Sequence, residues 1–108
     1  MTDTRGGEGN RDSAPLYLIA VLKPKVERAD DVRTALGSLM AASQAEPGCH
    51  YYDLVVGTDD PTTWYMIEKW ASEAAWQEHM RTPHVTSFNA QAEEYFRAPT
   101  ELRRYSDR

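Results

Sequence analysis

The sequence predicts an α+β domain of the ferredoxin-like type, with helices covering one side of a four-stranded sheet. Segments of strand and helix periodicity follow one another in the order β-α-β-β-α-β, and a strand pattern changes directly into a helix pattern at Ser72. The chain has 108 residues, enough for one domain with a modest core. Because apolar side chains occur on both faces of the first three strands, we expect a two-fold dimer to cover the second face.

The N-terminal stretch differs in composition from the rest of the chain. Residues 1–13 read MTDTRGGEGNRDS, which combines glycines and charges with no apolar residue that could anchor the segment. We therefore expect a disordered leader over residues 1–14 and a single domain over residues 15–108.

The first half of the domain is predicted to hold a strand, a helix and a second strand. Residues 15–23 form a nearly continuous apolar run, typical of a strand covered on both faces. Residues 27–44 follow a helical pattern, and a Pro-Gly pair ends it. Gly37 inside this helix predicts a close backbone approach. Residues 49–57 form the second strand, and a turn follows. The helix buries one stripe, made of Val32, Leu36, Leu39, Met40 and Ser43.

The second half begins with the third strand, where Trp64, Met66, Glu68 and Trp70 share one face because side chains two apart point the same way. Ser72 is a good N-cap and starts a short helix that carries a Trp and a His. A further helix begins at residue 82, where a Thr caps and a Pro takes the first position. Residues 100–105 alternate weakly, which fits an edge strand or a segment that swaps onto another subunit.

Composition excludes several classes of protein. The net charge of −5 and the pI near 5.1 leave no basic face for phosphates, so a nucleic-acid partner is not expected. The single Cys49 allows no internal disulfide and no multi-cysteine metal site. The longest apolar run, residues 16–22, is too short to cross a bilayer, and no secretory signal pattern is present. We therefore expect a soluble cytoplasmic protein without a membrane partner.

Three passages resemble a known family, and the weakest of them is the opening strand, LYLIAVLKPK. EPGCHYYDL (residues 46–54) is similar to the Glu-x-Gly-Cys-x-x-Tyr segment of the antibiotic biosynthesis monooxygenase (ABM) family, and IEKWASEAAWQEHMRTPHV (residues 67–85) is similar to its Glu-x-Trp segment with the following His and Thr-Pro-His. With the opening strand, the resemblance spans residues 15–106. It implies a dimeric α/β barrel with one pocket per protomer, between sheet and helices. Small members include quinol or anthrone monooxygenases that use O2 without flavin, metal or haem.

The candidate catalytic residues are His79 and Glu68. His79 matches the helix His of the family motif, and an imidazole can accept or return a proton near neutral pH. We expect Glu68 to pair with His79 and orient it, which would also fix the tautomer. A second interpretation stays open, in which His79 only forms a structural hydrogen bond with Glu68 or a backbone carbonyl.

The candidate substrate-binding residues are aromatic or lie near the pocket mouth. Trp70 and Tyr52 are expected to be the walls that hold a planar ring, and either Tyr51 or Tyr52 faces the pocket because neighbours on a strand point to opposite sides. Trp64 shares the strand face of Glu68 and is therefore a candidate, although packing in the core is the simpler explanation for it than substrate binding. His84 is placed near the pocket mouth. No metal site is predicted, because His79 and His84 have no third ligand in view.

The leading hypothesis is a cofactor-independent monooxygenase that oxidises a quinol or polyphenolic aromatic with O2 and works as a homodimer. A haem-degrading role is weaker, because the resemblance implies an Asn in the first strand and LYLIAVLK has none. A sugar-phosphate isomerase would need a basic pocket. A non-catalytic, stress-associated ligand-binding dimer is the fourth alternative. An open apolar pocket that reaches His79 would favour an enzyme.

Overall fold

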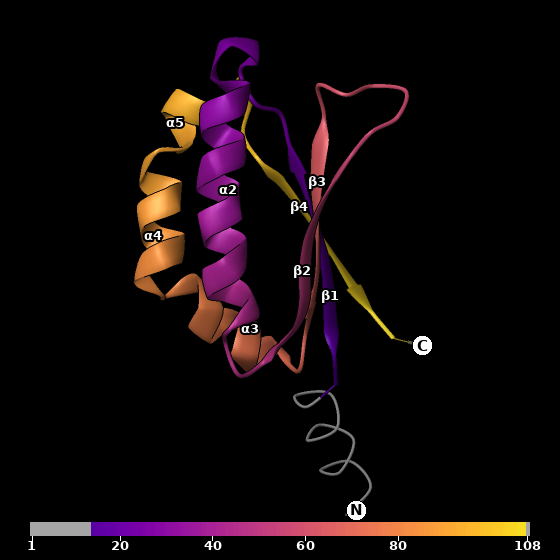
Figure 1. Cartoon of the computed structure of the whole chain (residues 1–108). Coiled ribbons are helices and arrows are strands. Elements are labelled where there is room, and N and C mark those ends of the chain that lie inside the picture. Colours follow the sequence, from indigo (N-terminus) through magenta and orange to yellow (C-terminus); the bar gives the residue numbers. More distant parts are fainter. Residues whose placement is uncertain (1–13, 108) are drawn as a thin grey trace, which may run out of the picture.

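A computed structural model describes residues 14–107, and the predicted leader apart from its last residue lies outside the described part. Four strands form one antiparallel sheet in the order β2-β3-β1-β4. Figure 1 shows this sheet nearly edge-on, with the strands labelled. The two central strands are β1 (Leu16–Leu22) and β3 (Trp64–Trp70), and the edges are β2 (Cys49–Val56) and β4 (Glu101–Ser106). The strands predicted from the sequence are confirmed to within about one residue, and the last is an edge strand as expected.

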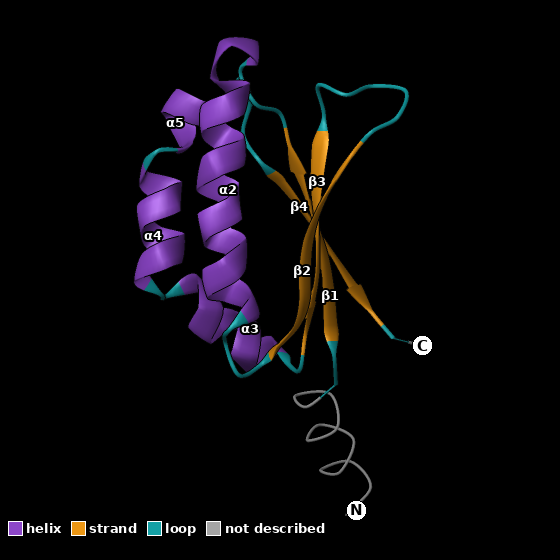
Figure 2. Ribbon diagram, viewed as in Figure 1, coloured by secondary structure: helices purple, strands orange, loops and turns teal. Residues whose placement is uncertain are grey.

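The helices lie together on one side of this sheet, as Figure 2 shows. A short 3-10 turn η1 (Val26–Arg28) leads into the long helix α2 (Ala29–Gln44). The second helical region consists of α3 (Glu73–Met80), α4 (Pro83–Ala90) and α5 (Ala92–Tyr95). No helix in the described part of the chain is long and apolar enough to cross a membrane. The α+β architecture predicted from the element order is therefore confirmed.

Two side-chain caps fix where the short helices begin. The hydroxyl of Ser72 accepts a hydrogen bond from the backbone N–H of Ala75, and the hydroxyl of Thr82 accepts one from Val85. Both caps were predicted, because Ser and Thr satisfy N–H groups that the first helical turn leaves without a partner. Thr82 also donates its hydroxyl to the carbonyl of His79 at 2.7 Å, which fixes the junction between α3 and α4.

The core lies between the helices and one face of the sheet. The alternate residues of β3 that begin with Trp64 are all buried, as the strand pattern predicted. The stripe of α2 that packs against them buries Val32, Leu36, Leu39 and Ser43. Register pairs Leu18 with Glu68, so the buried faces of β1 and β3 coincide. The predicted burial pattern is confirmed for β3 and for four of the five residues of the α2 stripe, while Met40 is only partly buried against the core.

No helix of residues 14–107 covers the other face of the sheet, which we call the outer face. Half-buried residues of β1 and β3 lie on it, together with three more exposed side chains, Tyr51 (37%), Val55 (47%) and Tyr105 (47%). The edge strands also place exposed Asp53, Glu101 and Arg103 on this face. A largely apolar centre with a charged rim is typical of a protein interface. The predicted dimer would cover it, and it stays a prediction.

The glycine that makes a close approach is not the one expected. A Cβ at Gly37 would meet no atom within 4 Å, because this residue lies on the exposed side of α2, so the expectation for Gly37 is wrong. A Cβ at Gly48 would instead lie 2.4 Å from the Cβ of Ala75. The turn before β2 therefore packs directly against α3, and this contact positions the site described next.

Candidate functional site

A cavity of about 260 Å³ lies between the sheet and the helices. Its walls are mainly apolar and come from all four strands and from α2, α3 and α4. Its polar groups are Tyr52, Glu68, His79, Asn89 and Thr100. A mostly apolar cavity with a few converging polar groups is the usual form of a small-molecule site. This open cavity reaches His79, which is the observation that was expected to favour an enzyme.

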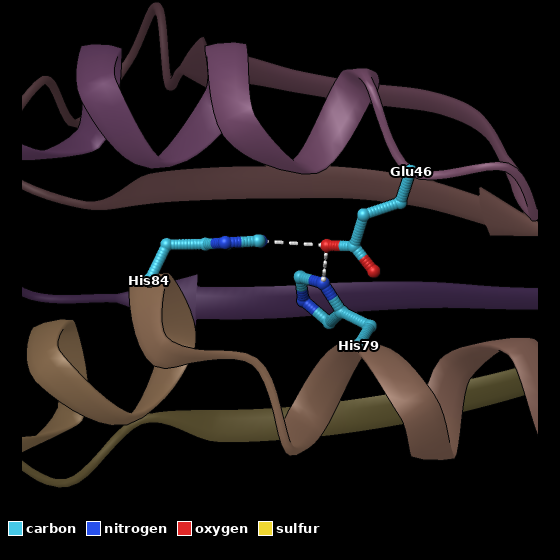
Figure 3. Close-up of side chains that lie close together, drawn as sticks. All are labelled: Glu46, His79 and His84. Atoms are coloured by element: carbon cyan, nitrogen blue, oxygen red, sulfur yellow. Dashed lines mark hydrogen bonds and ion pairs between the residues drawn. The ribbon is translucent and has the colours of Figure 1, made fainter.

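Beside the cavity, one carboxylate joins two histidines (Figure 3). Oε2 of Glu46 lies 2.8 Å from Nδ1 of His79 and 2.7 Å from Nε2 of His84. Glu46 lies in the turn between α2 and β2, His79 in the last turn of α3, and His84 in the first turn of α4. The turn is held by backbone hydrogen bonds from Glu46 to Ser43 and from Cys49 to Glu46.

The shared carboxylate fixes the proton positions on both rings. An ionised carboxylate oxygen can only accept hydrogen bonds, so Nδ1 of His79 and Nε2 of His84 are assigned as the donors. A neutral His79 then keeps its lone pair on Nε2, which forms no hydrogen bond within the described residues. Burial lowers the pKa of His79, and the neighbouring Glu46 carboxylate only partly opposes this effect. The ring is therefore a neutral base whose proton-bearing nitrogen is held in place.

Glu68 is the second titratable group on the cavity. It is buried, and its Oε1 accepts a hydrogen bond from Nε1 of Trp70 at 2.9 Å. The pKa of Glu68 is raised to about 7, mainly because the group is buried. The hydrogen bond from Trp70 acts in the opposite direction, and the charge of Glu46 adds to the rise. At neutral pH this carboxyl group can therefore hold or release a proton.

The predicted pairing of Glu68 with His79 is wrong. Glu68 is bonded to Trp70, its neighbour two positions along the same strand face, while Glu46 orients His79 from the turn after α2. Glu46 was missed because 33 residues separate it from His79. The expectation that no third ligand lies near the two histidines is wrong for the same reason. Glu46, His79 and His84 place their ligand atoms within 4.8 Å of one another and could together hold a metal ion.

The aromatic walls are only partly those expected. Tyr52 is buried and lines the cavity, whereas Tyr51 lies on the outer face, which settles the choice between them. Burial raises the pKa of Tyr52, so it remains a neutral phenol. Trp70 is fully buried behind His79, with ring centroids 4.4 Å apart, and does not line the cavity.

Two other predicted residues also lie off the cavity wall. Trp64 is at the far end of β3, where its Nε1 donates to the carbonyl of Pro61 and the guanidinium of Arg33 lies over its ring. His84 lies on a separate surface groove beside α2 and α4. Trp76, the Trp of the predicted short helix, was not among the candidate site residues but does line the cavity. Its spacing of three from His79 and four from Met80 was the signal, because these positions share a helix face.

Comparison with known proteins agrees with this fold. The model of the family described as "Antibiotic biosynthesis monooxygenase" matches residues 15–91. A Bacillus subtilis (strain 168) protein named "Putative monooxygenase YcnE" is 35% identical over 87 residues, covering 81% of this chain and 92% of that protein.

Solved structures are similar over nearly the whole domain. The Pseudomonas aeruginosa protein PA3566 has 32% identity and a TM-score of 0.81, covering 90% of this chain and 97% of that one. Rv0793 from Mycobacterium tuberculosis has 26% identity and a TM-score of 0.83, covering 88% and 96%. The family resemblance read from the two sequence motifs is thereby confirmed. The chain belongs to the antibiotic biosynthesis monooxygenase family.

Proposed function

We propose that the protein is a monooxygenase that oxidises a quinol or polyphenolic aromatic with O2. The observation that carries this proposal is the position of His79. Its Nδ1–H is held by Glu46 at 2.8 Å, while the ring lines an apolar cavity beside Tyr52. A base oriented by a carboxylate and placed in a mostly apolar cavity is well suited to take a proton from a phenolic hydroxyl.

The reaction begins with that proton transfer. Nε2 of His79 accepts the hydroxyl proton of the substrate, which leaves an electron-rich phenolate. This anion gives one electron to O2, and the two radicals combine to form a carbon–oxygen bond and a peroxide on the ring. Loss of water from the peroxide then leaves a carbonyl, so one oxygen atom enters the product and the other leaves as water. The apolar walls of the cavity limit access of bulk water to these anionic species.

Glu68 is proposed as the acid of the second half of the reaction. With a pKa of about 7 it carries a proton in a large fraction of molecules at neutral pH. Cleavage of the peroxide oxygen–oxygen bond requires a proton on the leaving oxygen, and a buried carboxylic acid on the cavity wall can supply it. The two titratable groups would therefore have different roles, His79 as the general base and Glu68 as the general acid.

The size of the cavity limits the substrate. An apolar cavity of about 150 Å³ is enough to bind benzene in an engineered protein. The cavity here measures about 260 Å³. This volume favours a one- or two-ring hydroquinone over a larger polycyclic anthrone.

The alternatives are less well supported. Among the described residues that line the cavity none is Lys or Arg, and Arg81 and Arg104 pair with Glu78 and Glu73 outside it. A phosphorylated substrate would meet the Glu68 carboxyl group there without a cation to balance its charge. A dimer whose pocket is only a vestige would need no open cavity at His79, so the cavity counts against that alternative. A dimer that binds a ligand without turnover is separated from the enzyme by the O2 test below.

We also propose that the working form is a homodimer joined through the outer face. Its exposed Tyr51, Val55 and Tyr105 would then pack against the same residues of a second chain. Two-fold pairing of like surfaces is the commonest form of protein assembly. The helix side of the sheet, with the cavity, would stay accessible in such a dimer.

The test is O2 consumption by the metal-stripped protein with a panel of one-, two- and three-ring hydroquinones and anthrones. We expect uptake above spontaneous autoxidation with the smaller substrates, and a fall of at least about 10²-fold in His79→Ala, the usual contribution of a general base. Trp64→Phe is the matched control, since Trp64 lies away from the cavity. Uptake equal to the protein-free blank for every substrate would refute the proposal.

A further inference from the structure

We propose that Glu46, His79 and His84 form a binding site for a divalent transition-metal ion of the Zn²⁺ and Co²⁺ class, and that a bound ion switches off His79 as a base. The first part stands on the geometry of the three residues alone. The second part rests on the function proposed above, in which His79 is the base.

The donor set is one that such ions prefer. Two imidazole nitrogens and one carboxylate oxygen make up the His₂Glu set of many zinc enzymes, and they leave positions open for water or another ligand. Here the three donors come from three separate segments, the turn after α2, the end of α3 and the start of α4, and their ligand atoms lie within 4.8 Å of one another. Three converging segments make a compact, chelating arrangement.

The distances fit an ion that replaces two protons. Glu46 Oε2 now lies 2.8 and 2.7 Å from the two histidine nitrogens, with a hydrogen between each pair. Metal bonds of about 2.0–2.2 Å put neighbouring ligand atoms roughly 3.0–3.4 Å apart. The carboxylate oxygen and each ring nitrogen therefore need to separate by well under 1 Å. The two histidine nitrogens, now within 4.8 Å of each other, need to move roughly 1.4–1.8 Å closer together, which rotation of the His84 side chain can supply.

Burial and charge also favour a cation. The side chain of His79 is 3% exposed, that of Glu46 is 13% exposed and that of His84 is 26% exposed, so the site is shielded but reachable from the groove on which His84 lies. Within residues 14–107, no Lys or Arg side chain forms an ion pair with Glu46. Its negative charge is met only by two imidazole N–H groups, and a divalent ion would neutralise it directly.

Occupancy has a specific consequence for His79. A metal ion on Nδ1 takes the lone pair of that nitrogen, so the ring proton must move to Nε2. Nε2 is the nitrogen that is otherwise free to accept a substrate proton. The loaded protein therefore presents an N–H donor in place of a base, and metal binding and proton abstraction by His79 exclude each other.

The test is titration of the chelator-treated full chain with Co²⁺, followed by visible absorption, and with Zn²⁺ by calorimetry, both without substrate. We expect one ion per chain, a Co²⁺ spectrum with nitrogen and oxygen ligation, and proton release on Zn²⁺ binding that grows as the pH falls. Glu46→Gln and His84→Gln should each weaken binding at least about 10-fold, since each removes a ligand. His50→Gln is the matched control, because His50 is the remaining histidine and is exposed on β2.

Several outcomes would overturn the inference. The site does not exist if Co²⁺ gives no saturable spectrum up to millimolar concentration, or if folded His84→Gln binds as well as the wild type. Loss of binding in His50→Gln would assign the metal to another part of the surface. If the wild type consumes O2, Zn²⁺ should inhibit it with a midpoint equal to the calorimetric Kd. Zn²⁺ binding without inhibition would refute the proposed loss of His79 as a base, while the metal site itself would stand. If the wild type shows no O2 uptake, the proposed function fails, but the binding test is unaffected.

Discussion

Replacement of Glu68 by Gln should change how the stability of the protein depends on pH. Glu68 is buried, and its pKa in the folded protein is about 7, compared with an ordinary value of 4.5. The folded state therefore holds this proton at pH values where the unfolded chain has released it. Folding takes up a proton between about pH 4.5 and pH 7, so the stability falls as the pH rises through this window.

The size of the effect follows from the difference in pKa. Each unit of difference in pKa corresponds to about 1.4 kcal/mol. Ionisation of Glu68 above pH 7 therefore lowers the free energy of unfolding by up to roughly 3 kcal/mol. Access of this group to the cavity reduces the value. Gln cannot ionise, and its side-chain oxygen can still accept the hydrogen bond that Trp70 Nε1 makes at 2.9 Å. The variant should therefore lack this cost while keeping the packing.

The assay is urea unfolding followed by tryptophan fluorescence at pH 5 and pH 8, at one protein concentration. The free energy of unfolding of Glu68→Gln, relative to the wild type, should be higher at pH 8 than at pH 5 by up to about 3 kcal/mol. Glu93→Gln, which changes an exposed carboxylate of α5, is the control and should follow the wild type at both pH values. If Glu68→Gln and the wild type lose stability in parallel between pH 5 and pH 8, the reasoning about Glu68 is refuted.

Three further substitutions test the packing and the assembly. Gly37→Ala should raise the free energy of unfolding by up to about 1 kcal/mol, because a Cβ there meets open space within a helix. Gly48→Ala should lower the free energy of unfolding by about 1–3 kcal/mol, because the added Cβ would lie 2.4 Å from the Cβ of Ala75. Urea unfolding of the two variants measures both effects. Equal stabilities of Gly37→Ala and Gly48→Ala would contradict the conclusion that Gly48 makes the close approach. Val55→Lys should shift the protein from dimer to monomer in analytical ultracentrifugation, since a charge would be buried in the outer-face interface; an unchanged sedimentation coefficient would place the interface elsewhere.

The site shows where prediction from sequence succeeds and where it ends. Tyr52, Glu68 and His79 were predicted and line the cavity, because strand and helix periodicity decide which face each side chain occupies. Trp70 was predicted as a wall but lies behind His79, since facing the core does not distinguish a cavity lining from the layer behind it.

The sequence by itself determined the order of elements, the buried face of β3 and the two helix starts at Ser72 and Thr82. Periodicity, caps and turn residues act over a few positions, so they can be read directly from the chain. Only the tertiary structure decided that Glu46 holds both His79 and His84, which lie 33 and 38 residues away in the chain. This contact forms because a turn packs against two helix ends that are distant in the sequence. Local patterns of periodicity and capping do not predict such long-range packing.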